Sequence, residues 1–293
     1  MIDRSFMQTI FQKKTSGAAL LQYLKMLLSQ FGYKNKTTDD KNYLIAEGDI
    51  PIALVAHLDT VHTVEPFQFF YDEKEMVMWS PQGLGADDRA GVILILSILT
   101  EGYRPHLIFT TGEEHGGIGA NKLVENYSEA PFDIDFMIEL DRCGSEDAVF
   151  YNCMNLSFID YICSFGFTFE EGSFTDICIL GRNWNIAAVN LSVGYYNEHT
   201  KAEYWDLFEA DNTITKVINI LRSKNNNMYM YVPATKDNRI IRCSCGKLCY
   251  PGEYDQITST YGPTKIPFTY NVCHSCKKLY EEGIDQIDFH KYF

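Results

Sequence analysis

The sequence predicts an α/β fold in which a mixed central sheet lies between two layers of helices, followed by a small C-terminal module. Strand-like and helix-like segments alternate over about 220 residues, which is the pattern of a three-layer α/β domain. Short apolar runs end repeatedly in polar clusters, as central strands do where ligand sites form. Five cysteines gather near the end of the chain, after this alternation has stopped. We therefore predict a domain of residues 1–225 and a module of residues 226–293.

The individual elements follow from apolar periodicity and from turn and cap signals. Ser16 and Gly32 are the candidate N-cap and C′ residues of the first helix. Asp87 and Asp88 lie in a Gly-rich loop, residues 83–91, that opens a later helix, where the helix dipole favours negative charge. In chain order the predicted elements are a helix at residues 16–32, strands at 43–46 and 52–56, an aromatic-rich β excursion at 66–79, a helix at 92–99, a strand at 107–109, a helix at 119–127, a strand at 132–140, a short strand and short helix between 147 and 169, a strand at 187–193 and a helix at 202–222.

Charge and composition narrow the class of protein. The net charge is −14, with 17 Lys and Arg against 32 Asp and Glu in residues 1–225, and 8 against 7 in residues 226–293. Phosphate binding needs clustered Lys and Arg, so nucleic acid is not an expected partner. No apolar run reaches the ~18 residues of a membrane span, and the first residues lack the apolar core of a signal peptide. We expect a cytoplasmic protein without membrane contact, in which scattered single cysteines stay reduced.

Polar residues that suit metal chemistry stand at the ends of the successive predicted strands. They are His57 and Asp59, Asp87, Glu113 and Glu114, Asp141, and His199. Two imidazoles and several carboxylates fit a pair of neighbouring Zn²⁺ ions. Such a pair can hold a shared water as hydroxide and polarise a carbonyl group. A free carboxylate beside the pair would take the proton of the water and pass it to a leaving amine.

These residues belong to five motifs that resemble, in the same order, the metal-site motifs of the co-catalytic zinc exopeptidases. That superfamily includes peptidase T, aminoacylase and the bacterial leucyl aminopeptidases, and the sequences of the motifs are most similar to those of peptidase T. The resemblance spans roughly residues 40–222 and implies the three-layer zinc-exopeptidase fold, which is phosphorylase/hydrolase-like. The motifs are His-Leu-Asp-Thr-Val at 57–61, Gly-Ala-Asp-Asp-Arg-Ala-Gly at 85–91, Thr-Gly-Glu-Glu-His-Gly at 111–116, Glu-Leu-Asp at 139–141 and Glu-His-Thr at 198–200.

The resemblance also implies a role for each motif residue. It makes Asp87 the bridging carboxylate, Glu113 the general acid/base, and Asp59 the residue that orients a histidine ligand. It implies a cis peptide bond between Asp87 and Asp88. The metal ligands that it implies are His57, Asp87, Glu114, Asp141 and His199.

The spacing of the motifs departs from relatives that carry a lid domain. Asp141 and His199 are 58 residues apart, and His57 and Asp87 are 30 apart. Neither interval holds another domain, so we expect a compact catalytic domain without a lid insertion. In lidless relatives the segment equivalent to residues 171–176 contributes to the substrate pocket, which makes Ser173 and Asp176 candidates there.

The C-terminal cysteines predict a structural zinc site. Thiolate pairs at short spacing suit one tetrahedral Zn²⁺, which can hold together a segment too small for its own core. Five thiols compete for four places: Cys273 and Cys276 form one pair, and the other is Cys243 with Cys245 or, as a slight preference, Cys245 with Cys249. The module resembles a zinc ribbon or treble-clef finger, and it is the candidate contact for a protein partner or for oligomer formation.

Together these observations predict a hydrolase with two catalytic zinc ions and one structural zinc. The expected activity is that of a metallopeptidase, cleaving an amide bond of short peptides as an aminopeptidase does. A zinc-bridging hydroxide would attack the carbonyl carbon while Glu113 carries the proton. Two alternatives stay open at this point. One is an amidohydrolase that deacylates N-acylated amino acids or another small amide. The other is a non-catalytic scaffold that binds a partner through its zinc finger.

Overall fold

The computed structural model describes residues 4–34, 36–39, 41–223, 227–243, 245–261 and 266–281. The chain divides into two compact units, Met1–Val232 and Pro233–Phe293. The division falls after Val232 rather than after residue 225, because the intervening backbone pairs with the first unit. Tyr229 donates to the carbonyl of Asp135 at 2.9 Å, and Met154 donates to that of Val232 at 2.7 Å. Residues 225 and 226, part of the predicted boundary, lie outside the described residues.

The first unit is built on a mixed sheet. In spatial order its strands are β1 (Lys36–Thr38), β2 (Tyr43–Ala46), β6 (Pro105–Thr110), β3 (Ile50–His57), β7 (Phe136–Arg142), β10 (Ala188–Ser192), β8 (Asp147–Val149) and β9 (Thr168–Glu170). The four central strands, β6, β3, β7 and β10, are parallel to one another, and antiparallel strands β2 and β8 flank them. All four are almost completely buried, which matches their apolar sequences.

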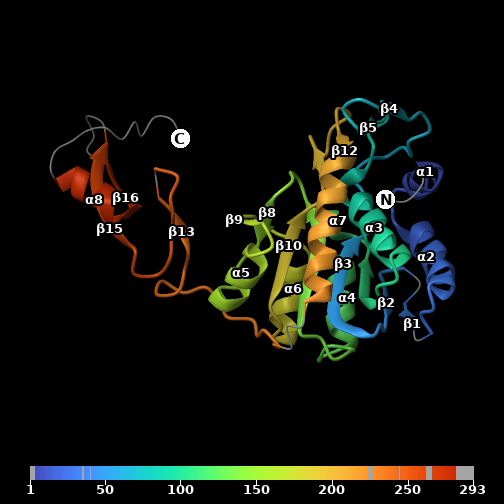
Figure 1. Cartoon of the computed structure of the whole chain (residues 1–293), viewed down its shortest axis with the longest axis horizontal. Helices are drawn as coiled ribbons and strands as arrows, with labels where there is room; N and C mark the ends of the chain where they lie inside the picture. The colour runs from blue at the N-terminus through green and yellow to red at the C-terminus, as the bar shows by residue number, and fades with distance from the viewer. Residues whose placement is uncertain are drawn as a thin grey trace. The chain divides into compact units, whose positions relative to one another are not determined.

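Helices cover both faces of this sheet, which confirms the predicted three-layer α/β fold (Figure 1). One layer contains α3 (Ala86–Thr100) and α7 (Leu207–Arg222), and the other contains α4 (Ile118–Asn126) and α6 (Asp176–Trp184). Leu123 of α4 and Leu180 of α6 share one buried cluster with Val55, Ile108 and Met137 of the sheet. Alternate residues of each strand face the opposite layer. The remaining helices of this unit are α1 (Arg4–Phe11), α2 (Ala18–Gln30) and α5 (Leu156–Cys163).

A second, smaller sheet contains the predicted β excursion. Strands β4 (Phe70–Asp72) and β5 (Val77–Trp79) form a hairpin that pairs with β12 (Tyr204–Asp206), which in turn pairs with β11 (Tyr195–Tyr196). Helix α7 therefore begins at Leu207 and not at residue 202, because β12 occupies the intervening residues. Asp206 caps this helix by accepting hydrogen bonds from the N–H groups of Phe208 and Glu209.

The N-terminal helices are tied to the loop that follows β3. Gly17, and not the predicted Ser16, is the N-cap of α2, and it has a left-handed φ of 77°. A Cβ atom at Gly17 would lie 2.9 Å from the backbone nitrogen of Asp59. The buried guanidinium of Arg89 makes a second tie. It donates to the backbone carbonyls of Ile10, Phe11, Lys13, Lys14 and Leu58.

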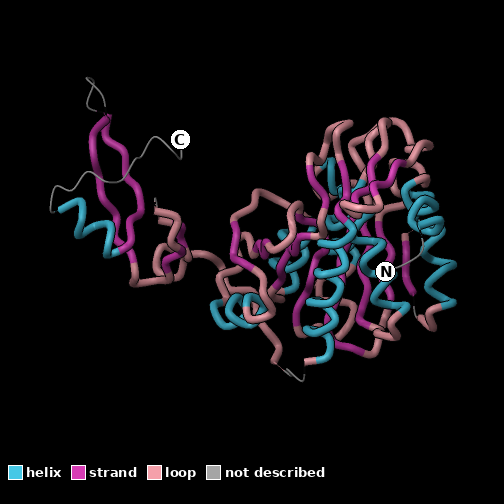
Figure 2. Tube along the Cα trace, turned by 45° about the horizontal axis from the view of Figure 1, so that its top comes forward, coloured by secondary structure: helices cyan, strands magenta, loops and turns pink. Residues whose placement is uncertain are grey.

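The described residues of the second unit form two hairpins and a helix. Strands β13 (Ile241–Arg242) and β14 (Leu248–Cys249) form the first hairpin. Strands β15 (Tyr254–Tyr261) and β16 (Ile266–Cys273) form the longer one, and α8 (His274–Glu281) follows directly (Figure 2). None of the helices in the described part of the chain is long and apolar enough to span a membrane.

Replacing Arg89 with Met should destabilise the first unit by about 3–5 kcal/mol, because five buried or partly buried carbonyl groups lose their donor. The measurement is denaturant unfolding followed by tryptophan fluorescence, since Trp79, Trp184 and Trp205 all lie in this unit. The control is Arg182→Met, the same chemical change at an exposed position of α6, with an expected loss of about 0.5 kcal/mol. Equal losses in the two variants would contradict the role given to Arg89.

Candidate active site

The predicted site residues meet at the carboxyl ends of the parallel strands. His57 ends β3, with Asp59 two residues later, and Asp141 lies near the end of β7. Glu113 and Glu114 lie in a 3₁₀ turn that follows β6. Asp87 comes from the start of α3 and His199 from the loop after β11. Parallel strands bring their carboxyl ends to one edge of the sheet, so residues up to 142 positions apart in sequence become neighbours.

Asp87 lies at the centre of this group. Its Oδ1 atom is 3.0 Å from Nε2 of His57, and its Oδ2 atom is 3.0 Å from Nε2 of His199. Nε2 of His57 is also 3.4 Å from Oδ1 of Asp141, and Nε2 of His199 is 3.3 Å from Oε2 of Glu114. The five residues therefore form two imidazole–carboxylate groups that share the two oxygens of one carboxylate.

The carboxylate of Asp59 lies beside the ring of His57. Its Oδ1 atom is 3.5 Å from Nδ1 of His57, and the opposite ring nitrogen, Nε2, faces Asp87 and Asp141. The same oxygen accepts hydrogen bonds from the backbone N–H groups of Gly112 at 2.7 Å and Glu113 at 3.3 Å. Asp59 thereby joins the strand end that carries His57 to the turn that carries the two glutamates.

Other residues of the 85–91 motif determine the backbone conformation at the start of α3 and its packing against β7. The peptide bond between Asp87 and Asp88 is cis, as the resemblance implied. The buried Asp88 carboxylate accepts from the N–H of His57 at 3.1 Å and from that of Gly91 at 3.0 Å. Gly91 has to be glycine, because a Cβ atom there would lie 1.9 Å from the carbonyl oxygen of Leu140. The helix can then approach β7 closely enough to bring Asp87 near Asp141.

Glu203 supports the site and was missed by the sequence analysis. Its side chain is completely buried. Its Oε1 atom accepts from the N–H of Asp87 at 3.0 Å, and its Oε2 atom lies 3.0 Å from Nε2 of His62 and accepts from the N–H of Gly85. The available signal was an acidic residue four positions after His199. His62 is held by this pairing with Glu203, and His115 is exposed.

Asp141 has two further partners that the sequence analysis did not identify. The hydroxyl of Thr175 donates to Oδ2 of Asp141 at 3.0 Å. The hydroxyl of Tyr195 donates to the carbonyl oxygen of Asp141 at 3.1 Å and lies 3.4 Å from its Oδ1 atom. Neither residue stands in a motif: Thr175 precedes α6, and Tyr195 lies on β11. Asp176, a candidate for the substrate pocket, is instead buried and accepts from the hydroxyl of Thr110.

The carboxylates of the site are crowded and only partly compensated. Burial, together with the neighbouring Asp141, Asp176 and Glu114, raises the pKa of Glu113 to about 8. Burial and the negative charge of Asp87 raise the pKa of Glu114 to about 7. Oε1 of Glu114 is buried without a hydrogen-bond partner in the described part of the chain. Such a set of oxygen and imidazole donors fits divalent metal ions, and zinc in particular.

A pocket of about 140 Å³ opens beside these residues. Five carboxylates line it, together with Ser173 and Phe174 of the loop before α6. Arg142 also lines it, and its Nε atom lies 3.3 Å from Oδ2 of Asp147. The carboxylates are those of Asp87, Glu113, Glu114, Asp141 and Glu198.

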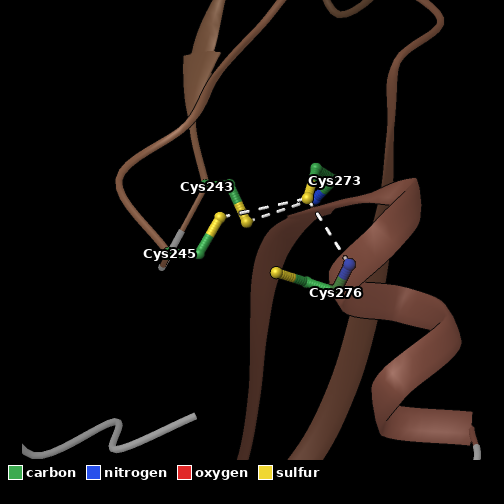
Figure 3. A group of neighbouring side chains, drawn as sticks. All are labelled: Cys243, Cys245, Cys273 and Cys276. Atoms are coloured by element: carbon green, nitrogen blue, oxygen red, sulfur yellow. Dashed lines mark hydrogen bonds between the residues drawn. The ribbon is translucent and has the colours of Figure 1, made fainter.

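The second unit holds a separate group of four thiols. Cys243, Cys245, Cys273 and Cys276 have sulfur atoms that all lie within 4.8 Å of one another. Figure 3 shows these side chains converging from the turn after β13 and from the junction of β16 with α8. The slight preference for Cys249 as the partner of Cys245 is not met. Cys249 lies on β14 outside this group, with its thiol 3.6 Å from the carbonyl of Lys247.

The thiol group is the centre of the small core of this unit. Apart from Ile241 and Val272, the buried residues of its core cluster are cysteines. Burial opposes ionisation of Cys243, but the backbone N–H groups of Cys245 and Cys273 lower the pKa of its thiol to about 7. The thiolate is the form that binds metal. Four converging cysteines of this kind fit one tetrahedral zinc ion.

Comparison with known proteins agrees with this geometry. Residues 37–158 match the model of Peptidase family M28. No curated protein matches the sequence. Among solved structures, a tripeptidase from Staphylococcus aureus is 15% identical, with a TM-score of 0.62 over 74% of this chain and 96% of its own. Aminopeptidase PepT from Bacillus cereus is 14% identical, with the same TM-score and coverage.

A Zn-dependent exopeptidase from Parabacteroides distasonis is also similar, at 15% identity. Its TM-score is 0.54, over 75% of this chain and 95% of the other. At these identities the solved structures establish the fold. The family match over residues 37–158 and the shared fold agree with the resemblance that the motifs predicted.

Proposed function

We propose that the first unit hydrolyses the first peptide bond of short peptides, using two zinc ions. His57 and Asp141 would bind one ion, Glu114 and His199 the other, and Asp87 both. The observation that carries this assignment is the carboxylate of Asp87, whose two oxygens each lie 3.0 Å from a different imidazole. A zinc pair, when bound, polarises the carbonyl of the substrate and lowers the pKa of water.

Glu113 is the proton carrier in this proposal. It lines the same pocket as Asp87 and Asp141 and lies on the turn held by Asp59. As a carboxylate it accepts a proton from the attacking water, whose oxygen forms a bond to the carbonyl carbon. It then gives that proton to the nitrogen of the breaking C–N bond. The products are a carboxylic acid and an amine, and Glu113 returns to its starting state.

The charge of the pocket favours an aminopeptidase over the deacylase alternative. Zinc would offset the charge of Asp87, Glu114 and Asp141, but Glu198 also lines the pocket, and Arg142 there is already paired with Asp147. The carboxylate of Glu198 attracts the positively charged amino terminus of a peptide and repels the carboxylate of an N-acylated amino acid. Comparing the hydrolysis of tripeptides with that of N-acetyl amino acids separates these activities.

We also propose that the second unit binds one structural zinc ion through Cys243, Cys245, Cys273 and Cys276, as a zinc ribbon or treble-clef finger does. The proposal is supported by the convergence of the four thiols and by the small number of other buried apolar residues in the unit. A core of this size needs an additional cross-link to be stable.

Replacing Glu113 with Gln should lower kcat for a tripeptide by about a hundredfold or more, because proton transfer loses its carrier. The zinc content of the full chain should stay unchanged, which elemental analysis measures. Glu125→Gln, at an exposed position of α4, is the matched control and should keep full activity. If Glu113→Gln stays active, or loses zinc, the assigned role is wrong. If the wild type with zinc bound hydrolyses no amide at all, the scaffold alternative is favoured.

The structural zinc site is tested by two cysteine variants of the full chain. Cys276→Ser should lose one zinc ion per chain, because it removes one of the four converging thiols. Cys249→Ser should keep the zinc content of the wild type, since its thiol lies outside that group. Loss of zinc in the Cys249 variant alone would show that the ligand set is assigned wrongly.

Removal of metal should make the stability of the first unit fall as pH rises from about 5 to 8. Glu113, Glu114 and Asp141 have folded-state pKa values raised to about 8, 7 and 6, all well above those of an unfolded chain. The folded state therefore binds more protons across this range, and deprotonation destabilises it. The measurement is the midpoint of thermal unfolding with EDTA, followed by tryptophan fluorescence. Protein with zinc bound should show a weaker pH dependence, and an equal or opposite slope would contradict the prediction.

A further inference from the structure

A second pocket adjoins the first at His199. Its volume is about 570 Å³, and His199 is the residue that lines both pockets. A substrate held beside the metal ligands and extending past His199 would therefore enter it. The residues that line it are Val61, His62, Thr63, Val64, Phe67, Pro81, Gln82, His199, Thr200 and Lys201.

The two pockets differ in charge. Five carboxylates line the first, whereas no acidic residue lines the second. The absence is notable because residues 1–225 carry 32 acidic residues against 17 Lys and Arg. The second pocket contains Lys201 and exposed apolar side chains, with Val64 51% and Phe67 65% exposed. It is therefore suited to the part of a peptide that carries negative charge.

Lys201 is the cation of this pocket that is available to a ligand. His62 is paired with Glu203 at 3.0 Å, and His199 is paired with Asp87 and Glu114. Lys201 is exposed, and it forms no ion pair with any residue in the described ranges. An incoming carboxylate would meet an ammonium group that does not have to leave another partner.

A tight turn fixes Lys201 beside the metal site. The hydroxyl of Thr200 donates to the carbonyl of Asn197 at 2.7 Å, and Glu203 donates its N–H to the carbonyl of Thr200 at 3.3 Å. Glu203 is in turn anchored to the backbone of Asp87. The position of Lys201 relative to His199 is thus set by the same contacts that hold the bridging carboxylate.

We propose that the second pocket receives the carboxyl-terminal part of a peptide of two or three residues, and that Lys201 binds its terminal carboxylate. The inference rests on the proposed function and specifies its substrate class. The second pocket adjoins the metal ligands at His199 and contains Lys201. Because an extended residue spans about 3.3–3.6 Å, this pocket takes the one or two residues that follow the cleaved bond. The amino terminus of the same peptide lies in the first pocket, which Glu198 also lines.

The test compares trialanine with trialanine amide as substrates of the full chain with zinc bound. The amide lacks the carboxylate, so its KM should exceed that of trialanine by roughly three- to tenfold. In Lys201→Met the ratio of the two KM values should fall to about one. In Lys201→Arg most of the wild-type ratio should remain, because the positive charge is kept. Lys74→Met removes a positive charge at an exposed position away from the pocket, and should keep the ratio of the wild type.

Binding to the Glu113→Gln variant separates this inference from the proposed function. Titration calorimetry should show tighter binding of trialanine than of its amide, and adding Lys201→Met should remove the difference. If the wild type hydrolyses neither peptide while this binding difference remains, the proposed function fails and the second pocket stands. If hydrolysis occurs but the KM ratio is one, or is unchanged in Lys201→Met, the assignment of Lys201 is overturned.

Discussion

The structure of the first unit depends on one buried carboxylate whose two oxygens are shared between two imidazoles. Asp87 can take this position because α3 begins directly above the ends of β3 and β7, and because Gly91 allows the helix to approach the carbonyl of Leu140. His57 and Asp141 then approach from one side and His199 and Glu114 from the other. Negative charge gathered in this way is unfavourable without cations, so metal binding and the stability of the unit are coupled.

Three further carboxylates, those of Glu203, Asp88 and Asp59, accept hydrogen bonds from the backbone segments that position the candidate metal ligands. Glu203 accepts hydrogen bonds from the N–H of Asp87, Asp88 from that of His57, and Asp59 from that of Glu113. Each bond joins segments that are far apart in sequence. Part of the acidity of residues 1–225 is therefore structural. These carboxylates satisfy backbone donors at strand and helix ends where no secondary-structure partner exists.

The sequence predicted the site residues that lie in short motifs. It did not predict the residues that support the site through tertiary contacts. Apolar runs that end in polar clusters predicted the strands along the chain and the strand ends that carry His57 and Asp141. Thr175 contacts Asp141 from the loop before α6 and Tyr195 from β11, and no spacing in the sequence signals such contacts. Arg89 stands in a motif rich in carboxylates, yet it binds main-chain carbonyls of a helix about 80 positions earlier. Its partners became clear only from the packing of α1.

The two imidazoles of the site differ in their access to solvent. The side chain of His57 is 1% exposed, whereas that of His199 is 52% exposed. In the proposed zinc pair, the ion bound by His57 should therefore exchange slowly with metal in solution. The ion bound by His199 should exchange fast. A partly loaded protein would then be a defined species, with its enclosed position filled and its open position in equilibrium with free metal. The availability of metal around the protein could in this way set the fraction of molecules that carry a complete pair.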